Sequence, residues 1–208
     1  INFSGVGESP DYAIWVRRGT GRVFNNTITN PGGMNNIVKG ANYRDDNIVA
    51  LWGQCAGAGT YDQNSNGTGY RCVDQPGSGT SNDLAGAATP PAQWVGNVLD
   101  PIYEWDNTTT GSISFGRVGG STNVVINRDF FEDNNSFNGT SGVGSGVIAS
   151  RPATCTTGVA YWATNEGEWW AANAGNDGHL YKCTSTNTWT LSYTPYTYPH
   201  SLQSGAGG

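Results

Sequence analysis

Short runs of β-branched and aromatic residues recur along the chain, and Gly, Pro or Asn bounds each run. Runs of this length and composition predict short β-strands. They occupy residues 13–16, 22–29, 47–52, 102–106, 112–115 and 123–126. The stretch 165–174 is compatible with a helix, although Gly167 makes it a weak helix former. We therefore expect an all-β chain with many turns.

Two of these runs end in the same pattern. Residues 23–27 (VFNNT) and 103–108 (YEWDNT) share an aromatic residue, Asn or Asp, Asn and Thr in that order, and residues 131–136 are a looser third copy. In a parallel solenoid, an Asn at one corner of successive coils can satisfy backbone groups and stack on its neighbour. The repetition therefore predicts neighbouring coils; unrelated turns in an Asn-rich chain are the alternative.

The composition supports β structure and excludes several partners. The 208 residues suffice for one domain with its own core. Charged residues make up only 12%, while the chain has 31 Gly, 8 Trp and 10 Tyr, which argues against disorder. The net charge of −6 comes without a cluster of cations, and no apolar run is long enough to cross a bilayer. We expect neither nucleic-acid binding nor membrane insertion.

The four cysteines are Cys55, Cys72, Cys155 and Cys183, and they allow three disulfide connectivities. We favour Cys55–Cys72 and Cys155–Cys183, because each bond closes a loop that core packing could not hold, and each contributes about 3 kcal/mol. The spacing typical of zinc ligands is missing, which leaves zinc as the weaker alternative. Disulfides predict a secreted protein in an oxidising compartment.

Two long segments separate the strand-rich parts of the chain. They are residues 43–101, which contain the first cysteine pair, and residues 139–182. Structureless loops of this length are unusual in a compact domain. We expect both insertions to fold around their own disulfides and to serve a function or an assembly contact.

The C-terminal part resembles a known group of proteins. Residues 190–200 (TLSYTPYTYPH), with 158–162 (GVAYW), 180–183 (LYKC) and 187–189 (NTW), resemble the closing segment of bacterial secreted right-handed parallel β-helix proteins, the pectate-lyase-like superfamily. Further segments are similar to stretches that are typical of that group, namely residues 23–27, 43–46, 72–79 and 128–131.

This resemblance implies a fold. It implies one right-handed parallel β-helix domain over residues 1–208, decorated by the insertions near 43–101 and 139–182. Members of the group are usually longer, and this chain opens at Ile1 as if within a solenoid. We therefore expect a processed chain or a fragment that lacks N-terminal coils.

The resemblance also suggests candidate residues for catalysis and Ca²⁺ binding. Lyases of the superfamily hold Ca²⁺ on carboxylates beside a basic residue, and the candidates are Arg44, Asp45, Asp46 and Asp74. Neighbouring Asp45 and Asp46 on a strand would point to opposite faces, so one cation could not use both without a turn. We expect no cofactor, with Ca²⁺ as the open alternative.

A glycosidase would instead need two carboxyl groups about 5–9.5 Å apart. Its candidates are Glu104, Glu132, Glu166 and Glu168, and the chain has two histidines, His179 and His200. No nucleophile elbow accompanies them. The sequence therefore favours a protein that is not an enzyme.

Large rings near the C-terminus suggest the function. Flat aromatic faces stack on sugar rings, so we predict a ligand-binding surface; the alternative is that these rings cover the open end of the solenoid. The predicted binding residues are Tyr161, Trp162, Trp169, Trp170 and Trp189.

The functional hypothesis follows from these rings and from the missing catalytic constellation. We expect a non-catalytic extracellular binding or surface protein whose partner is a polysaccharide or a copy of itself. The alternatives are a polysaccharide-active lyase or glycosidase, and a fibre subunit whose open solenoid ends stack on one another.

Overall fold

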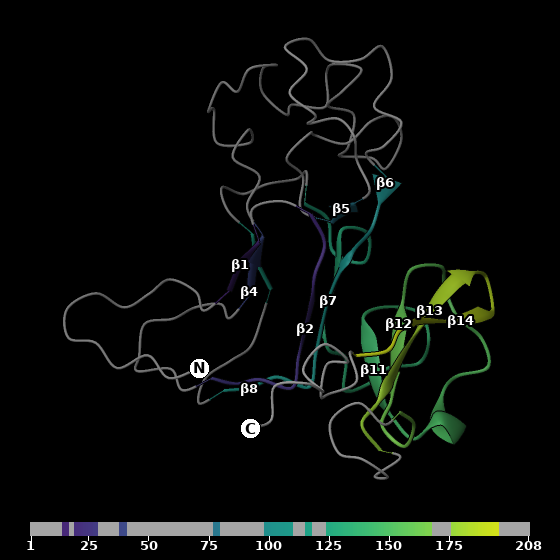
Figure 1. Ribbon diagram of the computed structural model, residues 1–208. Coiled ribbons are helices and arrows are strands. Elements are labelled where there is room, and N and C mark those ends of the chain that lie inside the picture. The colour runs from purple at the N-terminus through teal and green to yellow at the C-terminus, as the bar shows by residue number, and fades with distance from the viewer. Residues whose placement is uncertain are drawn as a thin grey trace, which may run out of the picture. The chain divides into compact units, whose positions relative to one another are not determined.

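The fold is strand-rich with almost no helix, as expected. The computed structural model describes residues 14–16, 19–28, 38–40, 77–79, 98–109, 115–117, 124–167 and 176–195. They form short strands and one 3-10 turn, η1 (Ile148–Ser150) (Figure 1). None of the helical structure in these ranges is long and apolar enough to cross a membrane.

The chain divides into two compact units. Unit 1 comprises Ile1–Glu132 and unit 2 comprises Asp133–Gly208. The expectation of one β-helix domain over the whole chain stays a prediction.

Unit 1 contains three parallel sheets. The first has the order β1-β4-β9, the second β10-β7-β2, and the third pairs β3 with β8. Along the chain, the strands visit the first, second and third sheet in turn and then begin the sequence again. The bounds are β1 (Ile14–Val16), β2 (Arg22–Phe24), β3 (Thr27–Ile28), β4 (Val38–Gly40), β7 (Ile102–Trp105), β8 (Thr108–Thr109), β9 (Phe115–Arg117) and β10 (Phe130–Phe131).

Smaller elements complete this unit. β5 (Ser78–Gly79) and β6 (Val98–Leu99) form an antiparallel pair between β4 and β7 along the chain. Of the predicted run 123–126, Ile126 forms an isolated bridge to Phe130. The predicted run 47–52 lies outside the described residues.

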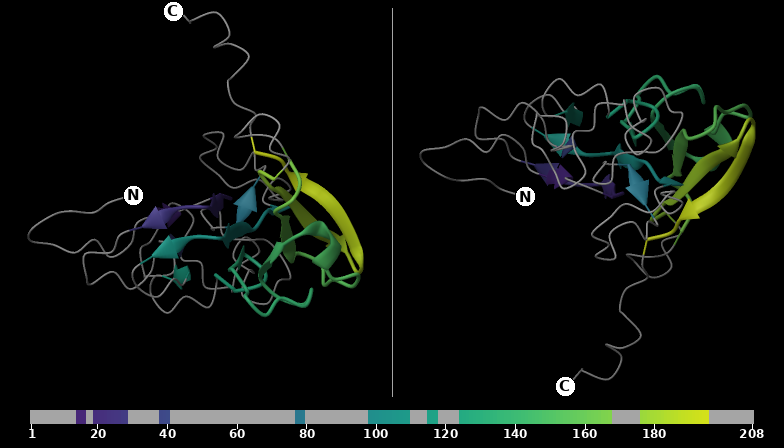
Figure 2. Two further views of the ribbon diagram at one scale, coloured as in Figure 1. Left: turned by 90° about the horizontal axis from the view of Figure 1, so that it is seen from below. Right: turned by 90° about the horizontal axis from the view of Figure 1, so that it is seen from above.

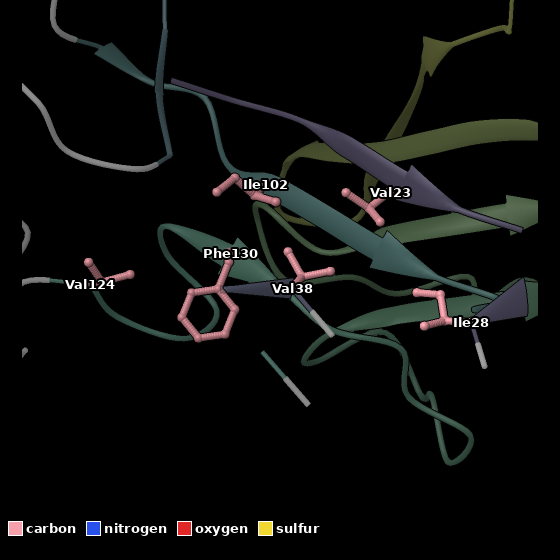
Figure 3. Close-up of a cluster of buried hydrophobic side chains, with 6 residues drawn as sticks. All are labelled: Val23, Ile28, Val38, Ile102, Val124 and Phe130. Carbon is pink, nitrogen blue, oxygen red and sulfur yellow. The ribbon is translucent and has the colours of Figure 1, made fainter. Parts of the chain in front are cut away.

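The core of unit 1 gathers aliphatic and aromatic side chains from all three sheets. Within the second sheet, Val23 pairs with Glu104 and Ile102 pairs with Phe130, so their side chains share one face. Burial of each side chain stabilises the fold by about 1.5–3 kcal/mol. The buried members are Val23, Ile28, Val38, Ile102, Val124 and Phe130 (Figure 3).

The opposite face of the second sheet carries stacked rings. Phe24 stacks on Trp105 with ring centres 4.6 Å apart and planes 1° apart, and Tyr103 stacks on Phe131 at 5.2 Å. Tyr103 and Trp105 are fully buried. Strand β7 is therefore buried on both faces, as is usual for a parallel sheet.

The turn after β2 and the turn after β7 have the same conformation. Asn25 and Asp106 both adopt the left-handed region, with φ of 51° and 50°. Asn and Asp tolerate this region because their short polar side chains bond locally. Each turn redirects the chain from the second sheet into the third sheet.

A buried amide joins these two turns. Asn107 is only 7% exposed, and its Nδ2 donates to the Val23 carbonyl at 2.9 Å. Its Oδ1 accepts from the Asn26 backbone N–H at 3.1 Å and from Asn26 Nδ2 at 2.9 Å. The Thr108 N–H then donates to the Asn26 carbonyl at 2.8 Å. The repeated pattern is therefore a hydrogen-bonded pair of corners.

The register confirms that the two main copies of the pattern lie side by side. Phe24 pairs with Trp105, and Thr27 pairs with Thr108, in parallel strands. The third copy begins in the same register, because Phe131 pairs with Tyr103.

Unit 2 is a four-stranded mixed sheet. Its order is β11-β12-β13-β14, with β11 parallel to β12 and the other two pairings antiparallel. Figure 2 shows β13 and β14 as a bent pair. The bounds are β11 (Val143–Gly146), β12 (Ala160–Ala163), β13 (His179–Ser185) and β14 (Thr188–Tyr193).

None of the four strands of this sheet lies in a run that the sequence predicted, and β11 was the least expected. Its residues, VGSG, lack the β-branched and aromatic run that predicts a strand. Gly144 is needed there because a Cβ atom would overlap the Phe137 ring. Parts of the predicted insertion 139–182 therefore belong to an ordered sheet, namely β11, β12 and the start of β13.

The Asn107 amide generates a stability prediction. Asn107→Leu removes its hydrogen bonds and leaves the Val23 carbonyl and the Asn26 N–H without this partner. We expect the free energy of unfolding to fall by about 2–4 kcal/mol in urea titrations. The control is Asn135→Leu at an exposed position, which should change stability by less than about 0.5 kcal/mol. Equal effects of the two substitutions would contradict the structural role of Asn107.

Candidate functional site

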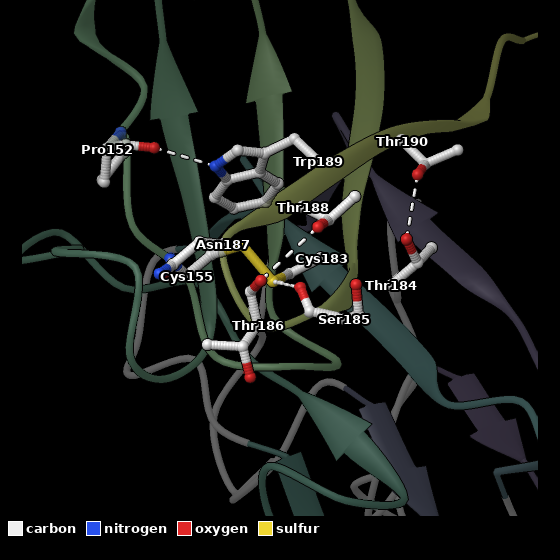
Figure 4. Close-up of a disulfide and its surroundings, with 10 residues drawn as sticks. All are labelled: Pro152, Cys155, Cys183, Thr184, Ser185, Thr186, Asn187, Thr188, Trp189 and Thr190. Carbon is white, nitrogen blue, oxygen red and sulfur yellow. Dashed lines mark hydrogen bonds between the residues drawn. A yellow bond between two sulfur atoms is a disulfide. The ribbon is translucent and has the colours of Figure 1, made fainter.

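A disulfide clip organises one end of the unit 2 sheet. Cys155 and Cys183 are bonded, with their Cα atoms 6.0 Å apart (Figure 4), which confirms this predicted pair. The Cys155 N–H donates to Asn187 Oδ1 at 2.9 Å, and the Asn187 N–H donates to the Cys155 carbonyl at 3.0 Å. These bonds tie the β13–β14 turn to the segment before β12. Cys55 and Cys72 lie outside the described residues.

A further bond extends the clip to an aromatic side chain. Trp189, the second residue of β14, donates its indole N–H to the Pro152 carbonyl at 2.8 Å (Figure 4). Phe137 contacts the same indole, with ring centres 6.4 Å apart. The Pro152 carbonyl and the Phe137 ring thus both fix the Trp189 ring, which remains half-buried.

Arg151 lies against two rings of this sheet. Its guanidinium carbon is 4.5 Å from the centre of the Tyr181 ring and 5.3 Å from that of Trp189. Each cation–π contact stabilises by about 0.5–2 kcal/mol. Tyr181 and Cys183 are two residues apart on β13, so their side chains point to the same face of the sheet. Trp189 pairs with Cys183 on the neighbouring strand, so the Tyr181 and Trp189 rings share that face.

Next to Tyr181 is a small polar cluster. The Tyr181 hydroxyl donates to Glu166 Oε2 at 2.6 Å, and His179 Nδ1 lies 3.4 Å from the same oxygen. This hydrogen bond raises the pKa of Tyr181, and burial and the Glu166 charge add to the rise, whereas Arg151 opposes it. The Glu166 and His179 side chains are about a quarter exposed, at 27% and 24%.

We define the β13–β14 site as Arg151, Glu166, His179, Tyr181 and Trp189. It combines half-buried aromatic rings with a cation, a carboxylate and an imidazole. Such a site can stack an apolar ligand face and hydrogen-bond its polar groups. Of these residues, only Trp189 was among the predicted binding residues, while Glu166 was a predicted glycosidase acid.

The structure places the other predicted binding residues differently. Tyr161 and Trp162 are only 3% and 6% exposed, so most of each ring packs inside unit 2. The Tyr161 hydroxyl donates to the Val147 carbonyl at 2.9 Å, and its ring contacts Phe137 at 5.9 Å. Trp169 and Trp170 lie outside the described residues, so binding by these rings stays a prediction.

Arg151 was not among the site residues predicted from the sequence. It lies directly after η1 and before Pro152, far in sequence from the rings that it contacts. A single Arg in a polar segment carries no periodic or motif signal. Only the antiparallel pairing of β13 and β14 brings the two rings to it.

The predicted catalytic acids divide between the units. Glu104 and Glu132 belong to unit 1 and Glu166 belongs to unit 2. Glu104 is buried and accepts from Asn107 Nδ2 at 3.4 Å. The remaining candidates lie outside the described residues: Arg44, Asp45, Asp46, Asp74, Glu168 and His200.

Within the described ranges, no three or more His, Cys, Asp and Glu side chains gather so that they could hold a metal ion. The carboxylates predicted for Ca²⁺ fall outside those ranges, so Ca²⁺ binding stays an untested alternative.

The Glu166–Tyr181 hydrogen bond generates a pH prediction. Glu166→Gln removes the carboxylate charge, so we expect the pKa of Tyr181 to fall toward about 10, the usual tyrosine value. Because the folded-state pKa is raised, this contribution to stability is fully present below about pH 10 and is lost as pH rises through the folded-state pKa. Tyrosinate absorbance should report the shift, with Tyr181→Phe assigning the signal. Glu132→Gln is the control and should leave the Tyr181 titration unchanged.

Comparisons with known proteins do not identify a family for this chain. No protein-family model, curated protein or solved structure matches this chain.

Proposed function

We propose that unit 1 is a short right-handed parallel β-helix. All strand pairings within its three main sheets are parallel, and the chain visits those sheets in a repeating order. Each passage through the three sheets would form one coil, and parallel crossovers are right-handed in about 98% of cases. The Asn26–Asn107 corner supports the proposal, since stacked amides at a repeated corner stabilise neighbouring coils.

Engineered cross-links test this architecture. Thr27→Cys with Thr108→Cys should form a disulfide across β3 and β8, where the two hydroxyl oxygens are 3.3 Å apart. Trp15→Cys with Lys39→Cys should form one across β1 and β4, whose residues pair in register. The control Thr27→Cys with Thr109→Cys should not cross-link, because Thr27 pairs with Thr108 and position 109 is one residue out of register. Mass spectrometry reads the bonds, and failure of both in-register pairs would contradict the coil.

We propose that the protein is a non-catalytic extracellular binding protein that recognises glycans through the β13–β14 site. One observation carries this proposal: the half-buried rings of Tyr181 and Trp189 flank Arg151 beside the polar pair Glu166 and His179. Sugar recognition needs this combination, because pyranose rings present apolar faces and hydroxyl edges together.

The buried polar groups of unit 1 favour structural roles over catalysis. Asn107 joins the two corners, and Glu104 accepts one of its N–H groups. Asp129 is fully buried, accepts from the Val125 N–H at 2.8 Å and pairs with Arg128 at 2.6 Å. These groups stabilise the backbone around them. A lyase or glycosidase therefore has less support than a binding protein.

The disulfide supports the extracellular location. Cys155–Cys183 closes a loop with a sequence separation of 28 residues, and such bonds persist in oxidising compartments. A preformed, covalently clipped site suits a secreted binding protein, since rigid positioning lowers the entropic cost of binding.

A binding measurement on the full chain tests the function. Neutral and acidic oligosaccharides are titrated by calorimetry, and Trp189→Ala should weaken the binding of accepted ligands by about tenfold or more. Trp189→Phe should retain most of the affinity because it keeps an aromatic face. Trp15→Ala, an exposed tryptophan of unit 1 (39% exposed), is the matched control and should bind normally.

Two outcomes would contradict the proposal. Binding that is unchanged in a folded Trp189→Ala variant would move the site elsewhere. An absence of glycan binding, together with an oligomer in sedimentation that Trp189→Ala dissociates, would favour self-association instead.

A further inference from the structure

Arg151 differs from the other arginines whose contacts the structure describes. Its Nη1 is buried yet donates no hydrogen bond to any residue in the described ranges. Arg22 also has a buried nitrogen without a partner among the described residues, its Nε, but its other nitrogens donate to the Pro101 carbonyl at 3.1 Å and pair with Asp100 at 3.5 Å. Arg128 pairs with Asp129 at 2.6 Å, whereas the side chain of Arg151 makes no hydrogen bond or ion pair with the described residues. The other ionisable side chains of the site are already in contact with partners: Glu166 contacts His179 and accepts a hydrogen bond from Tyr181.

The ring contacts satisfy only part of this cation. The aromatic faces attract its charge, but they supply no acceptor in the plane of the guanidinium N–H groups. A buried donor of this kind without an acceptor costs about 1–3 kcal/mol, and more when it is charged. Nη1 itself has almost no accessible surface, but Arg151 as a whole is half-buried, so a ligand would reach the guanidinium through its other N–H groups, which make no hydrogen bond with the described residues.

Several contacts keep Arg151 in this position. Its backbone N–H donates to the Ile148 carbonyl at 3.1 Å, at the end of η1. The next residue, Pro152, accepts from the Trp189 indole, and the Cys155–Cys183 bond follows shortly after it. The Arg151 side chain is therefore already ordered in the folded protein, so a ligand that binds it does not have to supply the entropic cost of ordering it.

We propose that Arg151 binds the carboxylate of an acidic sugar, which names the ligand class of the β13–β14 site and rests on the function proposed above. The planar guanidinium fork matches the two oxygens of a carboxylate. Leu191 pairs with Tyr181 across the β13–β14 ladder and is 48% exposed, so it offers an apolar surface beside the Tyr181 ring. A ligand with a carboxylate and an apolar ring face uses both features.

Matched ligand pairs test this assignment on the full chain. 3′-Sialyllactose is compared with lactose, and glucuronate with glucose, by calorimetry at fixed ionic strength. We expect at least one acidic member to bind about tenfold more tightly than its neutral partner. Arg151→Gln should abolish that preference, and Arg151→Lys should retain part of it, because Lys keeps the charge and loses the fork.

The control has the same charge change on the other side of the sheet. Lys182 follows Tyr181 on β13, and neighbouring residues of a strand point to opposite faces of the sheet. The Lys182→Gln variant should therefore keep the preference for the acidic sugar. If Arg151→Gln does not fold, NMR of the unsubstituted protein replaces it. The Arg151 Nε–Hε signal, assigned from the Arg151→Lys spectrum, should shift with the acidic sugar and remain in place with the neutral one.

The outcomes separate the two proposals. Equal affinity for acidic and neutral partners, or an acidic preference that survives Arg151→Gln, overturns the role of Arg151 and leaves glycan binding in place. The absence of binding to every sugar overturns both proposals. Loss of the acidic preference alone in Arg151→Gln supports both.

Discussion

The buried amide of Asn107 is the constraint on which the core of unit 1 depends. It holds the corner after β7 against the corner after β2, through the Val23 carbonyl and both nitrogens of Asn26. A slip of one residue between these strands would exchange their faces. Val23 would then leave the aliphatic core and Phe24 would leave its stack on Trp105. The amide therefore favours one register among several that a low-charge, Gly-rich chain could adopt.

In unit 2 a covalent bond has the corresponding role. Cys155–Cys183 and the reciprocal bonds of Asn187 attach the β13–β14 turn to the segment that carries Arg151. Arg side chains lose about 1.5–2 kcal/mol of rotamer entropy when they are ordered. The disulfide and the two ring contacts already fix the Arg151 side chain in the folded protein. Binding of a ligand would therefore not cost this rotamer entropy a second time.

The two units differ in how they use polar groups. In unit 1, Asn107 and Asp129 direct their buried side-chain hydrogen bonds to backbone groups, and this stabilises the turns. In unit 2, Arg151 lies on aromatic faces, and its Nη1 has no acceptor among the described residues. Unit 1 also has buried nitrogens that make no hydrogen bond with the described residues, Arg22 Nε and Trp105 Nε1, but Arg22 donates other hydrogen bonds, such as that to the Pro101 carbonyl. The side chain of Arg151 makes no hydrogen bond with the described residues and lies against two half-buried rings, which is why we propose binding for unit 2.

The sequence by itself determined the features that depend on neighbours in the chain. Short β-branched runs specified strands such as β1, β2 and β7, and the repeated Asn-Thr corners indicated that β2 and β7 lie together, because side-chain capping of a turn is a local property. The Cys155–Cys183 pair followed from its loop. Only the tertiary structure decided which rings are buried and which meet a cation. Tyr161 and Trp162 lie in the interior, whereas Tyr181 and Trp189 meet Arg151, because strand pairing and the bulges in β13 set the faces. Sequence spacing carries no signal for such contacts between distant segments.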